Sequence, residues 1–146
     1  MDGIDSKVNN VFLSEPGTED SRKIKLLLII TGLAVGGATN VVLNIGSYFS
    51  NHPDFEVQLI TGPIPPGRSD VTHLTHEQGI STQVVPSLIN DISPITNARA
   101  VADIRRIITR EKFDIVHTHS TVAGIIGRLA AFSARVPVIL HHVHGW

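Results

Sequence analysis

Two patterns of apolar residues alternate along the chain. Short, nearly unbroken aliphatic runs predict strands that are buried on both faces, and the stretches between them place apolar residues at helical spacing. The predicted strands are 24–30, 55–60, 81–85, 113–117 and 137–143, and the predicted helices are 38–50, 73–78, 95–112 and 120–134. Strands and helices that alternate in this order predict right-handed βαβ units. The expected fold is therefore α/β and Rossmann-like, a parallel sheet with helices on both faces.

The first 22 residues follow neither pattern. They are polar and acidic, and they offer little apolar surface to offset the entropy cost of ordering the chain. We predict a flexible polar leader over residues 1–22 and one domain over residues 23–146. The leader has no apolar core of the kind found in signal peptides. The longest aliphatic run, 26–30, is far shorter than the roughly 20 residues of a spanning helix.

Composition narrows the function classes. The 146 residues carry a formal net charge of -1 and contain no cysteine. A nearly neutral domain argues against nucleic-acid binding, which is normally accompanied by a strongly basic surface. Without cysteine the chain has no disulfide and no thiolate metal site, and nothing ties it to an oxidising compartment. We therefore expect a cytoplasmic protein with no nucleic-acid partner.

A glycine-rich loop joins the first predicted strand to the first helix. Gly36 and Gly37 stand where that helix begins. Adjacent glycines allow a ligand to approach the backbone, and the free N–H groups of a helix start attract phosphate. The G-x-x-x-G-G spacing is neither the dinucleotide-binding fingerprint nor a Walker A loop. Anion binding and a tight turn without a ligand are the two interpretations of this loop.

Histidines gather near the ends of the last two predicted strands. Five of the eight lie in the last thirty residues: His117, His119, His141, His142 and His144. The carboxyl ends of parallel strands share the edge where ligands bind, and a period of two places His117 with His119 on one face and His142 with His144 on one face. We interpret the group as a ligand-facing polar rim in which His141 is best explained by packing. A metal site is the alternative, disfavoured because no Asp or Glu follows Asp114.

Three small residues lie at the start of, or within, the helix that follows the fourth strand. Ser120 stands directly before it and is predicted to cap it. Gly124 and Gly127 lie within it and predict close packing of the helix on the sheet. The sequence shows no nucleophile–base pair with an orienting acid and no paired carboxylates suited to hydrolysis.

Three segments together resemble a known family. They are residues 29–39 with the glycine loop, residues 113–120 (Phe-Asp-Ile-Val-His-Thr-His-Ser) and residues 138–146, which end in Val-His-Gly-Trp. They resemble the N-terminal domain of family 4 glycosyltransferases, which have the GT-B fold. The similarity is greatest to the bacterial branch that builds capsular polysaccharide, exopolysaccharide and related cell-surface glycans. The resemblance runs from about Lys23 to Trp146.

The resemblance implies roles for five residues. Gly36 and Gly37 would approach the donor diphosphate and the reacting sugar, and His144 would be the catalytic residue that faces the donor sugar. His119 and Ser120 would line the interdomain cleft near the acceptor. This chain departs from the family at Val122, because relatives often carry a lysine there, and any cationic contact of that lysine is missing.

The resemblance also implies an activity. A retaining glycosyltransferase would move a sugar from a nucleotide-sugar to a glycan or lipid-linked acceptor, with no metal or other cofactor, because amides and cations stabilise the leaving diphosphate. Family members carry a second Rossmann-like domain with a Glu-x7-Glu pair for the donor, which these 146 residues lack. We therefore expect an acceptor-side half, truncated at its C-terminus and inactive alone. The alternatives are a non-catalytic Rossmann-like module that binds a phosphorylated ligand and a histidine-ligated metal hydrolase.

The predicted helix 95–112 has a local excess of positive charge. It carries five basic and two acidic side chains, a net charge of +3. Because related transferases often use lipid-linked acceptors, this face could hold the protein at the anionic inner face of the membrane. Each basic residue near such a surface contributes about 1 kcal/mol. The alternative is an ordinary solvated helix face.

Overall fold

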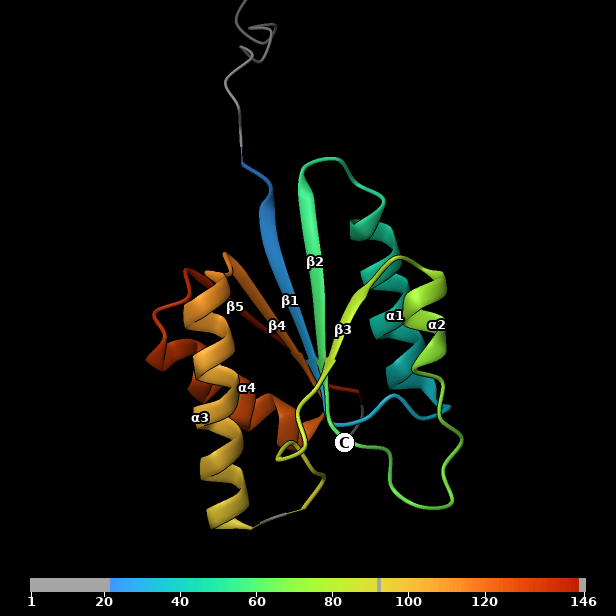
Figure 1. Cartoon of the computed structure of the whole chain (residues 1–146), viewed down its shortest axis with the longest axis vertical. Helices are drawn as coiled ribbons and strands as arrows, with labels where there is room; N and C mark the ends of the chain where they lie inside the picture. The colour runs from blue at the N-terminus through green and yellow to red at the C-terminus, as the bar shows by residue number, and fades with distance from the viewer. Residues whose placement is uncertain (1–21, 92, 145–146) are drawn as a thin grey trace, which may run out of the picture.

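The computed structural model describes residues 22–91 and 93–144. The predicted leader lies outside the described residues except for Arg22, and so do the last two residues of the family-like ending. Strands and helices alternate along the described chain (Figure 1). The elements are β1 (Ile24–Ile30), α1 (Gly37–Ser50), β2 (Phe55–Thr61), α2 (His73–Glu77), β3 (Ser81–Val84), α3 (Pro94–Glu111), β4 (Ile115–His119), α4 (Thr121–Ser133) and β5 (Val138–His142).

The five strands form one parallel sheet in the order β3-β2-β1-β4-β5. The chain moves outward from β1 to β3 and then returns to place β4 on the other side of β1. The prediction of a Rossmann-like parallel sheet is therefore confirmed. In sheets of this kind, ligands bind beyond the carboxyl ends of the strands where the order reverses, which here is between β1 and β4.

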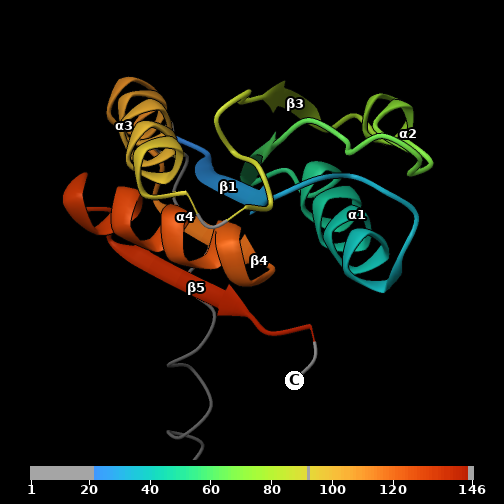
Figure 2. The same ribbon diagram turned by 90° about the horizontal axis from the view of Figure 1, so that it is seen from below.

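Helices pack on both faces of the sheet (Figure 2). On one face α1 buries Val42 and Leu43 against a cluster that includes Leu28. On the other face α3 and α4 cover a second cluster that includes Ile29 and Val116. Neighbouring residues of β1 thus contribute to opposite cores. This explains why the strand is an unbroken aliphatic run rather than an alternating one.

Most predicted boundaries lie within one residue of those observed, and the fourth strand is the main exception. It was predicted to end at His117, whereas β4 continues to His119. Two pairings with β5 extend it, Thr118 with His141 and His119 with His142. Thr118 and His119 therefore belong to β4, where they pair with β5, rather than to the loop after the strand.

Close packing of α4 on the sheet is confirmed at both predicted glycines. A Cβ on Gly127 would lie 2.6 Å from Cγ2 of Thr118, and a Cβ on Gly124 would overlap the ring of His141. Among the described residues, no helix is both long enough and apolar enough to cross a bilayer.

One part of the sheet is less covered than the rest. Val138 and Leu140 of β5 are 41% and 46% exposed. They lie on the same face as His117 and His142, because Leu140 is registered with His117 and side chains alternate along each strand. This is the face that α1 covers over β1 and β2 (Figure 2). On β5 this face is partly exposed among the described residues, whereas on β4 it includes the buried His119.

Candidate functional site

A polar cavity of about 310 Å³ lies beyond the carboxyl ends of β1, β4 and β5. Thr31 follows β1 and Ser120 follows β4, and their hydroxyl oxygens are 3.1 Å apart. The other lining residues are Asn90, Thr121, His141, Val143 and His144. The cavity therefore lies at the point where the strand order reverses, as the general rule for such sheets requires.

Ser120 occupies the N-cap position of α4, but its side chain makes no cap hydrogen bond. The predicted N-cap position is therefore confirmed, but the side-chain hydrogen bond usual for a capping serine is absent. The backbone has a φ of 66° and a ψ of 161°, a conformation that only glycine adopts readily. This conformation carries the hydroxyl away from the helix start and toward Thr31. Strain of this kind costs about 1–3 kcal/mol and is concentrated at functional sites.

The glycine pair lies where the sequence predicts, with Gly36 at the N-cap of α1 and Gly37 as its first residue. A Cβ on Gly37 would meet nothing within 4 Å, and the nearest atom to a Cβ on Gly36 would be 3.9 Å away. The φ of Gly36 is 164°, which is ordinary extended backbone. Neither packing nor backbone conformation therefore requires glycine here. Both residues are exposed, which leaves their N–H groups open to a ligand.

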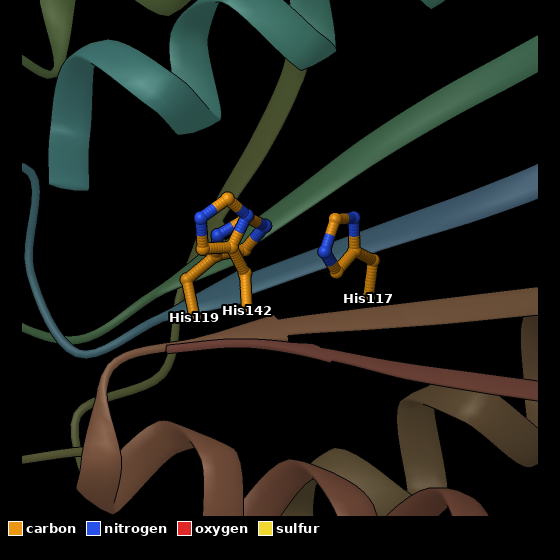
Figure 3. A group of neighbouring side chains, drawn as sticks. All are labelled: His117, His119 and His142. Carbon is orange, nitrogen blue, oxygen red and sulfur yellow. The ribbon is translucent and has the colours of Figure 1, made fainter. Parts of the chain in front are cut away.

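Three histidine rings lie together on one face of β4 and β5: His117, His119 and His142 (Figure 3). The ring centroids of His117 and His119 are 4.2 Å apart, and those of His119 and His142 are 5.7 Å apart. The ring of His144 stacks on His142 at 4.4 Å. The prediction that each pair shares a face is confirmed, and the ladder brings the two pairs together.

His119 is completely buried, and its Nδ1 lies 3.0 Å from Nε2 of His144. Burial, with a smaller contribution from the neighbouring histidines, lowers the pKa of His119 to about 3. Burial is also the main cause of the lowered pKa values of His117 and His144. These three rings are therefore neutral at pH 7, and each offers one nitrogen lone pair and one N–H donor.

His141 projects from the opposite face. Its Nδ1 lies 3.0 Å from Oγ1 of Thr118 and 3.2 Å from the carbonyl oxygen of Thr118. Gly124 leaves room for its ring against α4. The interpretation of His141 as a histidine held by packing is confirmed, although it also borders the cavity.

The structure brings Ser120, His119 and His144 together, whereas Gly36 and Gly37 are not among the residues that line the cavity. Sequence reasoning missed Thr31 and Asn90. Thr31 carried a usable signal, because it is the first residue after a buried strand at the expected edge. Asn90 follows β3 within a loop whose path the sequence does not reveal.

Comparisons with known proteins agree with this architecture. The sequence profile of the glycosyl transferase 4-like domain matches residues 36–146. UDP-Gal:alpha-D-GlcNAc-diphosphoundecaprenol alpha-1,3-galactosyltransferase of Escherichia coli is 32% identical over 127 residues, which are 85% of this chain and 30% of that protein. The chain therefore spans less than a third of the length of this relative.

Two solved structures are similar in fold. A lipopolysaccharide outer core galactosyltransferase has a TM-score of 0.66 at 18% identity, over 83% of this chain and 33% of that one. A UDP-N-acetylglucosamine 2-epimerase has a TM-score of 0.59 at 13% identity, over 82% and 32%. At these identities the likeness concerns the fold alone, and a fold can support different reactions.

The match in sequence is stronger evidence of family membership than the similarity in fold. The segment matched by the profile includes every residue to which the sequence assigns a site role, from Gly36 to His144. The five-stranded parallel sheet agrees with the N-terminal half of the GT-B fold. The chain belongs to the glycosyl transferase 4-like domain family.

Proposed function

We propose that this chain is the acceptor-side half of a retaining glycosyltransferase that moves a sugar from a nucleotide-sugar to a glycan or lipid-linked acceptor. The observation that carries the proposal is the polar cavity where the strand order reverses, with the strained Ser120 and the neutral His144 on its wall. The name of the E. coli relative gives UDP-galactose as donor and a diphosphoundecaprenol-linked sugar as acceptor, which supports substrates of these two classes.

The donor diphosphate would bind at the start of α1. Gly36 and Gly37 present backbone N–H groups with open space around them. The positive end of the helix dipole adds roughly half a charge at this point. Transfer increases the negative charge on the leaving diphosphate, so fixed amides stabilise the transition state more than the ground state. This transfer step involves no metal and no other cofactor.

His144 would contact the donor sugar near the reacting carbon. Its Nε2 is engaged with Nδ1 of His119, which leaves Nδ1 of His144 for a sugar hydroxyl. A neutral imidazole donates or accepts such a hydrogen bond without introducing charge. His119 lies beneath His144 and is wholly buried, so its part in lining the cleft would be to position the His144 ring.

The acceptor would enter beside Ser120, whose hydroxyl lies on the cavity wall next to Thr31. The remaining contacts to the nucleotide would come from a second domain, in keeping with the chain's coverage of 30% of its E. coli relative. We therefore propose that these 146 residues do not catalyse transfer alone. The proposed location is the cytoplasm, at the inner face of the membrane when the acceptor is lipid-linked.

NMR titration of the chain with UDP-galactose tests this assignment. We expect shifts in the amide signals of Gly36 and Gly37 and in the ring signals of His144. Gly79, which follows α2 and does not line the cavity, serves as an internal control. A response of the glycine pair alone, reproduced by inorganic diphosphate, would favour the alternative of a non-catalytic module that binds a phosphorylated ligand. No response at any of these positions would contradict both functions.

A further inference from the structure

Two adjacent strands bring three imidazoles together on one face of the sheet (Figure 3). His117 and His119 are two residues apart on β4, and His142 is the ladder partner of His119 on β5. One ring nitrogen from each histidine lies within 4.8 Å of the others. Their backbone positions are fixed by the hydrogen bonds of the sheet, so the group is already assembled before any ligand binds.

One of these nitrogens has no partner among the described residues. Nε2 of His119 is buried and makes no hydrogen bond, and a buried polar atom without a partner costs about 1–3 kcal/mol. Nδ1 of the same ring is engaged with Nε2 of His144 at 3.0 Å. When the His119 proton is on Nδ1 and is donated to His144, Nε2 keeps an unused lone pair.

The chemistry of the group selects the kind of ligand that would use this lone pair. It consists of imidazoles without a carboxylate or a thiolate, which suits Zn²⁺, Ni²⁺ or Cu²⁺ and not Mg²⁺ or Ca²⁺. Tetrahedral Zn²⁺ with Zn–N bonds of about 2.0–2.1 Å needs nitrogens roughly 3.3–3.4 Å apart. To close a separation of up to 4.8 Å to this value, the rings must rotate out of their stacked arrangement, in which the interplanar angles are 24–39°. His142 is exposed and has room to rotate.

We propose that His117, His119 and His142 form a binding site for a divalent transition metal ion, preferentially Zn²⁺. His144 is the outer partner that holds the tautomer and the orientation of His119, as carbonyls and carboxylates do at other histidine metal sites. The ion joins the carboxyl ends of β4 and β5 and leaves a fourth coordination position for water or an anion. Sequence reasoning disfavoured a metal for want of a nearby carboxylate, but three nitrogen ligands do not require one.

The site goes beyond the proposed function. Transfer as proposed uses Nδ1 of His144, Ser120 and the glycine pair, with His119 only positioning His144, and the ligands His117 and His142 take no part in it. Failure of one proposal therefore leaves the other standing, because metal binding is measured without donor, acceptor or turnover.

Titration of the tag-free chain with Co²⁺ and Zn²⁺, after treatment with a chelator, tests the site. We expect one ion per chain, the visible absorption of tetrahedral Co²⁺, displacement of Co²⁺ by Zn²⁺, and no binding of Mg²⁺. His142→Gln, at an exposed position, should weaken binding more than tenfold without affecting the fold. His119→Gln should do the same where it folds. His144→Gln should weaken binding by about 10–100-fold, the usual effect of removing an outer partner.

Two controls separate this site from adventitious binding by histidine. His76→Gln, at an exposed position on α2, and His141→Gln, on the opposite face of the sheet, should leave the affinity unchanged. The proposal is wrong if His142→Gln binds Zn²⁺ as tightly as the parent chain, or if the chain takes up no Co²⁺. In either case the rings only stack on one another.

Discussion

The hydroxyl oxygens of Thr31 and Ser120 lie 3.1 Å apart, although 89 positions separate the two residues in the sequence. This contact joins the ends of β1 and β4 across the point where the strand order reverses. The contact also accounts for the unusual backbone of Ser120, because the positive φ directs the hydroxyl to Thr31 rather than to the N–H groups of α4.

Two substitutions at Ser120 test for backbone strain. Both Ser120→Gly and Ser120→Ala remove the hydroxyl, but only glycine adopts a φ of 66° without steric cost. We expect the glycine variant to be more stable than the alanine variant, by about 1 kcal/mol beyond the preference for glycine over alanine at any N-cap. Urea unfolding of the two variants measures the difference. Equal stabilities would mean that the residue is not strained in solution.

Substitution in the glycine loop should separate folding from function. Gly37→Val fills space that is empty in the structure, so we expect native circular dichroism together with loss of transfer in the full-length enzyme. Gly62→Ala is the contrasting variant, because its Cβ would overlap the carbonyl group of Leu88 and the fold should be lost. Near-normal turnover in Gly37→Val would exclude this residue from the donor site.

Removal of His144 should slow turnover more than it weakens donor binding, because its hydrogen bond to the sugar strengthens in the transition state. His144→Ala in the full-length enzyme should therefore lower kcat with little change in KM for the donor. His141→Ala is the matched control. It removes a packed ring, so it should reduce stability but not the turnover of folded molecules. An equal loss of kcat in the two variants would point to His141 as the active member.

The carboxylate of Asp114 should make stability depend on pH. Hydrogen bonds from the Arg22 guanidinium, at 2.6 and 2.8 Å, and from the Lys25 backbone N–H lower its pKa. A carboxyl whose pKa is lower in the folded state stabilises the fold above its unfolded pKa of about 3.9. That contribution is lost as the pH falls through the folded value.

We therefore expect Asp114→Asn to be less stable than the parent chain at pH 7 and to approach it as the pH falls below about 3.9 and through the lower pKa of the folded state. Urea unfolding at a series of pH values measures this convergence. Glu77→Gln, on α2, provides a comparison at an exposed acidic residue. A constant difference between Asp114→Asn and the parent at every pH would show that the carboxylate charge contributes nothing.

The exposed arginines of α3 should bind anionic vesicles only weakly. Arg99 and Arg106 both pair with Asp103, at 4.0 and 3.3 Å, and Arg110 pairs with Glu111 at 2.7 Å. These ion pairs reduce the local field, and salt screens what remains. We expect sedimentation with anionic vesicles at low salt, release at high salt, and no sedimentation with neutral lipid.

Arg105→Gln combined with Arg106→Gln should reduce the sedimented fraction, whereas Arg68→Gln, in the loop after β2, should leave it unchanged. Sedimentation that is equal with neutral lipid, or absent at low salt, would mean that the arginines form an ordinary solvated surface.

The spacing of apolar residues within each element was enough to predict most of the fold. The aliphatic run of β1 and the apolar spacing of α3 each place their element to within a residue. Period two also placed His117 with His119, because it depends only on the geometry of a strand. In contrast, the burial of His119 and the contact between Thr31 and Ser120 depend on which strands are neighbours. A single sequence does not contain that information, and for this reason it predicts Ser120 at the N-cap but not the contact of its hydroxyl with Thr31.

The partly exposed face of β5 has a practical consequence for the isolated chain. Among the described residues β5 is one of the two edge strands of the sheet, and its sequence Val-Ile-Leu-His-His combines high β-propensity with no fixed charge. An uncharged edge strand with exposed Val138 and Leu140 is a template for pairing with a second chain. Concentrated preparations should therefore aggregate edge to edge through β5. Leu140→Lys, which places a charge on the exposed face, should keep them monomeric.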